Sequence, residues 1–99
     1  MTRKECLTAA IDAVCKDRES TYGSPEDNFS LIADLWSTYT GAKISPRDVA
    51  VMMILLKTAR VRNGTNHSDN FVDMAGYAAC AAEIMEPEKH GKPKFCFRV

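Results

Sequence analysis

Apolar residues recur at helical spacing in four stretches of this 99-residue chain, and capping or stop residues separate one stretch from the next. The stretches run over residues 3–19, 25–40, 45–63 and 68–85. Thr2 and Glu5 stand at capping-box spacing at the start of the first stretch. Each of the next two opens on a Ser-Pro pair and is followed by a glycine, which are signals of a helix start and a helix end. The pattern predicts an all-α bundle of about four helices, within one domain that spans residues 1–86.

The apolar faces of these helices define the expected core. The inward positions are Leu7, Ala10, Ile11 and Val14 in the first helix and Phe29, Ile32, Leu35, Trp36 and Tyr39 in the second. The centre of the third helix, VAVMMILL over residues 49–56, is apolar on every side, so we expect this helix to be buried all round. The fourth helix is rich in alanine and contains Gly76, which lets a neighbouring helix approach closely.

Residues 87–99 form a separate C-terminal arm or tail. Their proline and glycine residues exclude a long helix, and the final KFCFRV alternates apolar and polar positions. The segment is either a short strand or arm that docks on a neighbouring subunit or a frayed end. A small helical chain with an alanine-rich helix and such an arm buries more surface as a closed assembly, so we expect a homo-oligomer.

Composition narrows the classes of function. The 13 basic and 13 acidic residues cancel, which argues against general nucleic-acid binding but leaves room for a local cluster of cations that binds phosphate. The apolar run is too short to span a bilayer and the N-terminus has no signal-peptide core, so we expect a cytoplasmic protein without a membrane partner. The four cysteines form no C-x-x-C pair, and Cys6, Cys15 and Cys80 lie inside helical patterns. We therefore expect buried thiols and no zinc site.

An acidic stripe marks the last predicted helix. Asp69, Asp73 and Tyr77 follow one another at intervals of four residues, so they share one face. A short connection makes the last two helices antiparallel neighbours, and Lys57 then lies roughly 10 Å from the connection and Asp73 roughly 8 Å. We therefore expect Lys57 to pair with Asp73 and Arg60 to pair with Asp69. The pairs either only fix the register of the hairpin or belong to a binding site, because ion pairs of this kind are poor stabilisers.

A second polar cluster lies at the turn between the first two helices, in DRESTYGSPEDNF over residues 17–29. It offers Arg18, Tyr22 and Asn28 beside the backbone N–H groups of a helix start, which attract anions. The same residues also satisfy ordinary turn chemistry, with glycine for backbone freedom and Ser-Pro to open the helix. Both interpretations stay open from the sequence.

Together the two clusters make a candidate nucleotide site. Its residues are Arg18, Tyr22, Asn28, Lys57, Arg60, His67, Asp69, Asn70, Asp73 and Tyr77. The cationic side chains suit phosphates, the tyrosines can stack on a base, and the asparagines can recognise a base edge or a ribose. The aspartates can orient the cations, accept from a ribose hydroxyl or hold a metal ion. His67 has a simpler interpretation as a residue at the entry to a helix, and we assign no catalytic residue.

The motifs R-x3-YG-x-P-x2-NF, DVAVMMILLKTAR and H-x-DN-x2-D-x-AGYAA resemble those of a family of short, uncharacterised phage and prophage proteins. The resemblance covers about residues 15–85 and implies a location in the cytoplasm of a bacterial host. The layout is also distantly similar to the MazG-like all-α nucleoside triphosphate pyrophosphohydrolases, which work as dimers or tetramers and bind Mg²⁺ through paired acidic motifs. This sequence departs from their pattern, with Asn70 where an acid would stand and no E-x-x-E in residues 25–40.

Three functions stay open from the sequence. The first, which we favour, is a binding protein that holds a phosphate-containing nucleotide, such as a cyclic nucleotide signal of host defence, and one reason to hold such a signal is to sequester it. The second is a Mg²⁺-dependent nucleoside triphosphate pyrophosphohydrolase, in which Asp69 and Asp73 hold the metal ion together with Glu26 or Asp27. Only this second function calls for a cofactor. The third is a structural module, or one that binds a host protein, without a small ligand.

Overall fold

The computed structural model describes residues 1–17, 25–64 and 67–85. Within them lie four α-helices, α1 (Arg3–Asp12), α3 (Pro25–Thr40), α4 (Pro46–Arg62) and α5 (Asp69–Met85), and one π-helical segment, η1 (Ala13–Asp17). The predicted all-α bundle of about four helices is confirmed. The arm of residues 87–99 lies outside the described residues, so its boundary and its role stay predictions. None of the described helices has both the length and the apolar character needed to cross a membrane.

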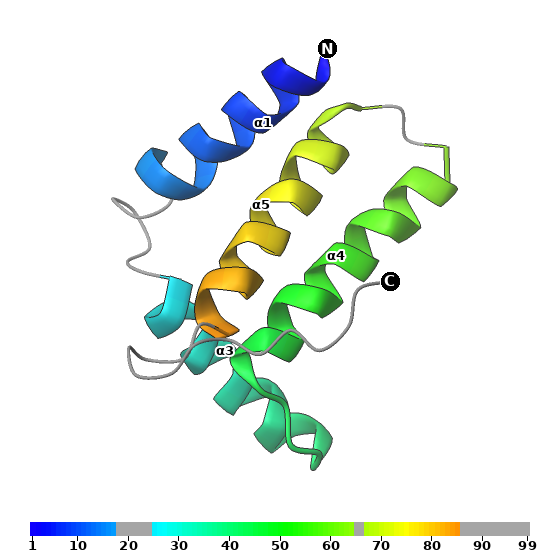
Figure 1. The fold of residues 1–99 in the computed structure, drawn as a ribbon. Coiled ribbons are helices and arrows are strands. Elements are labelled where there is room, and N and C mark those ends of the chain that lie inside the picture. The colour runs from blue at the N-terminus through cyan, green and yellow to red at the C-terminus, as the bar shows by residue number, and fades with distance from the viewer. Residues whose placement is uncertain (18–24, 65–66, 86–99) are drawn as a thin grey trace, which may run out of the picture.

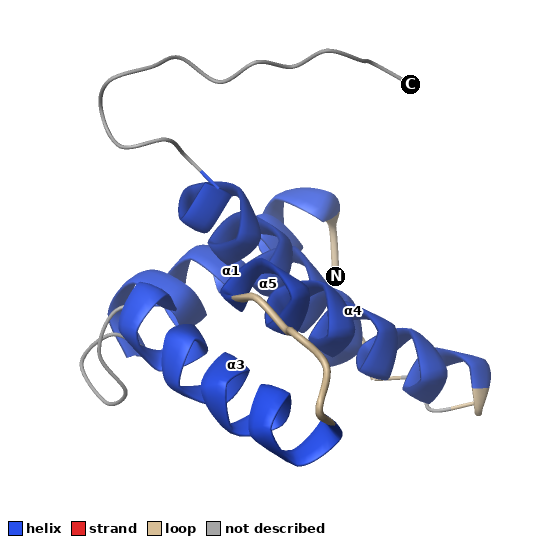
Figure 2. Cartoon of the chain, turned by 90° about the horizontal axis from the view of Figure 1, so that it is seen from below, coloured by secondary structure: helices blue, strands red, loops and turns tan. Residues whose placement is uncertain are grey.

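The central helix of the bundle is α5. Figure 1 shows it between α1 and α4, with α1 running in the same direction and α4 in the opposite one. The remaining helix, α3, packs across the end of this layer where α4 begins and α5 ends, as Figure 2 shows from below. Side chains on α5 therefore have α4 on one side and α1 on the other.

Helix ends follow the capping residues of the sequence. Thr2 and Glu5 form the predicted capping box of α1, in which Thr2 N–H donates to Glu5 Oε1 at 2.8 Å. A second capping box opens α4, where Ser45 N–H donates to Asp48 Oδ2 at 2.9 Å and Asp48 N–H donates to Ser45 Oγ at 3.1 Å. The bond from the Ser45 backbone, and then the bond from its side chain, lower the pKa of Asp48 below its ordinary value of 3.8. Each box satisfies backbone groups that the helix itself leaves unpaired.

The core lies where α3, α4 and α5 meet. Phe29 and Ala33 from α3 pack with Val49 and Ala50 from α4 and with Cys80 from α5. Half-buried apolar side chains surround this cluster and include Val14, Ile32, Trp36, Met53 and Tyr77. The inward positions predicted at Phe29, Ile32 and Trp36 are confirmed.

Other predicted inward positions are wrong. Leu7 and Ile11 of α1 are exposed, because this helix turns its small residue Ala10 toward the bundle. Leu35 and Tyr39 of α3 are exposed as well, since α3 contacts its neighbours only through the face that carries Phe29 and Ala33. The first helix also does not continue as an α-helix to residue 19, because it changes to π-helical geometry at Ala13.

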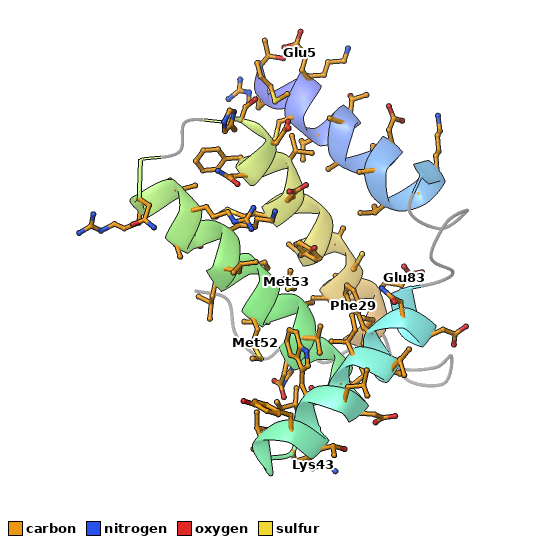
Figure 3. All side chains as sticks on the ribbon, turned by 180° about the vertical axis from the view of Figure 1, so that it is seen from behind. Glu5, Phe29, Lys43, Met52, Met53 and Glu83 are labelled. Carbon is orange, nitrogen blue, oxygen red and sulfur yellow. The ribbon has the colours of Figure 1, made fainter. Side chains whose placement is uncertain are left out.

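The prediction that α4 is buried all round is wrong too. Its residues Val49 and Ala50 are buried, but Val51, Met52, Leu55 and Leu56 are exposed. Figure 3 shows the change of side between consecutive residues, with Met53 lying toward α5 and Met52 lying away from it.

The described cysteines differ in exposure. Cys6, Cys15 and Cys80 form no disulfide, and Cys80 is buried as predicted. Cys15 is exposed and Cys6 is half-buried, so the prediction of buried thiols holds for one of the three. Cys96 lies outside the described residues.

Candidate functional site

A partly buried ion pair joins α4 to α5. Lys57 Nζ lies 2.8 Å from Asp73 Oδ2, and the two side chains are 14% and 39% exposed. The predicted pairing of these residues is confirmed. The lysine is the more enclosed partner, so its charge depends more on the carboxylate than the carboxylate depends on the lysine.

The antiparallel packing of α4 and α5 brings the pair together. At the end of α4, Asn63 N–H donates to Ala59 O at 3.0 Å, and Gly64 follows with a positive φ of 90° that ends the helix. The start of α5 follows within a few residues. A hairpin this short places residues at similar distances from the connection side by side, which is how Lys57 comes level with Asp73.

Two further polar side chains flank Asp73 on the same face of α5. Asn70 is 5% exposed, and its Nδ2 has no hydrogen-bond partner among the described residues. Tyr77 is half-buried, and its ring lies against Phe29 with the ring centroids 6.2 Å apart. We call Asn70, Asp73 and Tyr77 the polar stripe of α5. A buried amide nitrogen without a partner costs about 1–3 kcal/mol, so the needs of the fold alone do not explain Asn70.

A small cavity of about 50 Å³ borders the polar stripe, between η1 and α5. It is lined by Ala13, Val14, Val72, Asp73, Gly76, Tyr77 and Cys80. The close approach depends on Gly76, because a Cβ at this position would stand 2.9 Å from Val14 Cγ1. A cavity of this size holds a few water molecules and no nucleotide. A larger ligand would therefore reach Asp73 from its solvent-exposed side.

The hairpin end carries three of the predicted site residues. Arg60, His67 and Asp69 are all exposed there. The predicted ion pair between Arg60 and Asp69 is wrong, since no ion pair joins these two described residues. Both side chains stay hydrated at this end of the hairpin, where an ion pair gains little. Arg60 is therefore accessible to a ligand from solvent.

The remaining predicted residues come from the segment before α3 and from its first turn. Asn28 is half-buried and directly precedes Phe29, whose ring contacts Tyr77. This contact brings the backbone of α3 at Asn28 near Tyr77, but it does not place the Asn28 side chain in the site, since consecutive side chains point about 100° apart around a helix. Arg18 and Tyr22 lie outside the described residues, so their membership of the site stays a prediction.

Some surroundings of the site had no clear signal in the sequence. The sequence indicates that Gly76 allows close helix packing, but it does not show that Val14 is the residue that Gly76 admits. The π-helical turn that carries Ala13 and Val14 past the polar stripe also has no sign in the sequence, whose pattern predicts an α-helix there. A π-helical turn often lies beside a functional site.

The described residues around Asp73 offer few ligands for a metal ion. Within the described residues, no group of three or more His, Cys, Asp or Glu side chains is placed to hold a metal ion. Asp73 is already engaged by Lys57, and an ammonium group at this distance repels a cation. The pair as a whole is nearly neutral, so a phosphate gains attraction only where it reaches the Lys57 ammonium on a side away from the carboxylate.

Comparison with known proteins places the chain in a family. Residues 5–85 match the family described as "Domain of unknown function (DUF6378)". The chain belongs to this family. It is 47% identical over 78 residues to the Gene 55 protein of Mycobacterium phage D29, a match that covers 79% of this chain and 52% of the phage protein. It is also 43% identical over 89 residues to the Gene 55 protein of Mycobacterium phage L5, covering 89% of this chain and 57% of the phage protein.

The DUF6378 match confirms the predicted resemblance to a family with phage members, whereas the comparisons do not show the predicted similarity to MazG-like enzymes. No solved structure matches the chain. The chain spans about half the length of the two phage relatives. The region that matches DUF6378 contains Lys57 and the whole polar stripe, and it ends with α5.

Proposed function

We propose that this DUF6378 chain binds a phosphate-containing nucleotide at Lys57 and the polar stripe of α5. The observation that carries the proposal is the partly buried Lys57–Asp73 pair beside a buried Asn70 amide that has no partner in the described structure. Apolar residues at these positions would stabilise a helical hairpin at least as well. A ligand that engages the pair and the amide supplies a reason for their presence.

Each group suits one part of a nucleotide. Lys57 and the accessible Arg60 provide positive charge for a phosphate, and charge-assisted bonds of this kind are the strong ones. Asp73 is open enough to accept a hydrogen bond from a ribose hydroxyl while it keeps its contact with Lys57. Tyr77 presents an aromatic ring beside Phe29, against which a base can stack.

The role we propose is to hold the nucleotide and not to cleave it. A catalytic Mg²⁺ at Asp73 would need further carboxylates beside it, and the neighbour of Asp73 is the ammonium group of Lys57. Because the relatives come from phages, the first ligand class to test is a nucleotide signal of host defence, such as a cyclic nucleotide. Capture of such a signal without turnover would lower its free concentration in an infected cell.

A capture-and-release assay tests the proposal. The purified chain is incubated with linear nucleoside triphosphates and with cyclic dinucleotides, in the presence of Mg²⁺ and in the presence of a chelator. The free nucleotide is measured first, and the protein is then heated and the released compound identified. The proposal predicts a nucleotide that disappears from solution and returns intact, with or without Mg²⁺.

Lys57→Met provides the site-specific variant, because methionine keeps the aliphatic stem and removes the charge. We expect it to weaken nucleotide binding by roughly tenfold to a hundredfold, the value of one charge-assisted hydrogen bond. Lys43→Met is the matched control, since Lys43 is exposed in the segment between α3 and α4, away from the polar stripe. Equal binding by wild type and Lys57→Met would refute the site. Release of a monophosphate only when Mg²⁺ is present would establish the hydrolase instead.

A further inference from the structure

The outer face of α4 is apolar and exposed. Val51, Met52, Leu55 and Leu56 are between 41% and 60% exposed, and helical spacing places them in one stripe on the side of α4 opposite Lys57 and the buried Ala50. Monomeric proteins seldom leave contiguous groups of large apolar side chains in water, and such groups mark interaction surfaces. We call these four residues the outer apolar face of α4.

We propose that the outer apolar face of α4 is an interface between two copies of this chain, with the two α4 helices antiparallel and a two-fold axis at Leu55. In such an interface, a residue on one side of Leu55 meets the residue equally far on the other side in the second copy. Leu55 then meets its own counterpart. Val51 meets Ala59 of the second copy, and Met52 meets Thr58, so larger side chains face smaller ones and the helices can pack closely.

Charge complementarity identifies a second copy as the occupant. Asp48 and Arg62 lie seven residues before and seven residues after Leu55, and this heptad spacing puts all three on one side of the helix. In the proposed arrangement each Asp48 faces Arg62 of the other copy, so two opposite-charge pairs border the apolar centre. No ion pair engages Arg62 within the described residues, and the Asp48 carboxylate has acceptor capacity beyond its bond from Ser45.

The charges also select the register of the two helices. If the axis moved to a point between Met53 and Ile54, the apolar residues would still meet one another. Asp48 would then face Ala59 and Arg62 would face Ser45, which leaves both charges without a partner. Pairing of like helices through apolar positions with matched charges at the border is the usual way in which such interfaces set their register.

The interface leaves the nucleotide site open. Lys57 lies on the side of α4 that faces α5, opposite the side that carries Leu55. Each copy therefore keeps its own polar stripe accessible, and the dimer does not depend on the proposed function.

Sedimentation equilibrium of the full chain tests the dimer. We expect wild type to dimerise and Leu55→Glu to weaken the dimer by roughly a hundredfold or more, since each dimer loses two buried leucines. Leu31→Glu is the matched control, because Leu31 is a similarly exposed leucine on α3, 58% against 60% for Leu55. Both positions are exposed, so both variants should keep the far-ultraviolet circular dichroism spectrum of wild type. We expect Leu31→Glu to leave the dimer unchanged.

A charge reversal tests the register. Arg62→Glu places two carboxylates opposite each other at both ends of the interface, so we expect a weaker dimer and a larger loss at low salt than at high salt. Lys43→Glu makes the same change of charge away from α4 and should have no such effect. A monomeric wild type, or a dimer that Leu55→Glu leaves intact, would overturn the proposal. A dimer lost in Leu31→Glu and kept in Leu55→Glu would show that α3 is the interface, and would overturn it as well.

Discussion

Removing either charge of the Lys57–Asp73 pair should destabilise the fold by unequal amounts. Asp73→Asn keeps the size of the side chain and removes its charge, which leaves the ammonium of Lys57 in a side chain that is only 14% exposed. Lys57→Met leaves the carboxylate of Asp73, whose side chain is 39% exposed and can be hydrated in place. The enclosed charge loses more when its partner is removed.

The magnitudes follow from the two exposures. Breaking a fully buried pair costs about 3–5 kcal/mol, and breaking a surface pair costs about 0–1 kcal/mol. Lys57 is close to the buried limit but its ammonium adjoins a half-open carboxylate, so we expect Asp73→Asn to lower the free energy of unfolding by about 1–3 kcal/mol. For Lys57→Met we expect about 0–1 kcal/mol, because water replaces the lysine around Asp73. The double variant Lys57→Met/Asp73→Leu should regain most of the stability of wild type.

Urea unfolding of the four proteins measures these free energies. Far-ultraviolet circular dichroism follows the helices, and the fluorescence of Trp36, which packs on the core, follows tertiary structure. Coincident transitions would support two-state unfolding, which a comparison of the four free energies requires. Equal losses in the two single variants, or a double variant less stable than both, would refute the reasoning from burial.

Three other substitutions test separate features of the structure. Asn70→Leu removes the buried Nδ2, so we expect urea unfolding to show a free energy of unfolding about 1–2 kcal/mol higher than that of wild type. The capture assay should show weaker nucleotide binding by the same variant. A lower free energy of unfolding would mean that the amide is hydrogen-bonded in the protein. Gly76→Ala gains about 1 kcal/mol from helix propensity, but the added methyl group overpacks Val14 at a cost of about 1–3 kcal/mol. Urea unfolding should therefore show an unchanged or lower free energy of unfolding. A clearly higher value would contradict the close contact between Gly76 and Val14. Ser45→Ala should cost about 0.5–2 kcal/mol by removing the α4 cap. The lowered pKa of Asp48 contributes stability that is present above its ordinary value of 3.8 and is lost as the pH falls through its folded value. Ser45→Ala removes the side-chain bond and keeps the larger backbone bond, so unfolding of this variant should depend somewhat less on pH in that acidic range. A stronger dependence on pH than in wild type would contradict the part played by the Ser45 side chain.

Helix positions could be predicted because their signals are local. The second and third predicted helices match α3 and α4 to within a residue at the start, since a Ser-Pro pair and a capping box act within one turn. The ends of these helices are equally local, at Gly41 and Gly64, which both adopt positive φ. Which apolar face turns inward is not local. Leu35 and Tyr39 carry the same signal as Phe29, and only the position of the neighbouring helices decides that they are exposed.

The site was predictable where helix geometry determines it. The depth of two residues in an antiparallel hairpin predicts the Lys57–Asp73 pair, which the structure contains. The same geometry brings Arg60 and Asp69 to a similar level, but it cannot say whether hydrated side chains at the open end will pair, and they do not. The closeness of Val14 to Gly76 depends on a π-helical turn, for which the sequence has no reliable sign.

A nucleotide that binds at Lys57 and the polar stripe of α5 should change the surroundings of the buried Asn70 amide. The most direct measurement follows the side-chain amide signals of Asn70 by nuclear magnetic resonance in isotope-labelled protein, assigned by their loss in Asn70→Leu, while cyclic dinucleotides and nucleoside triphosphates are added in turn. We expect one of these ligands to shift the Asn70 signals in wild type and to shift them far less in Lys57→Met. Signals that stay unchanged with every nucleotide, or that shift equally in the two proteins, would contradict binding at this site.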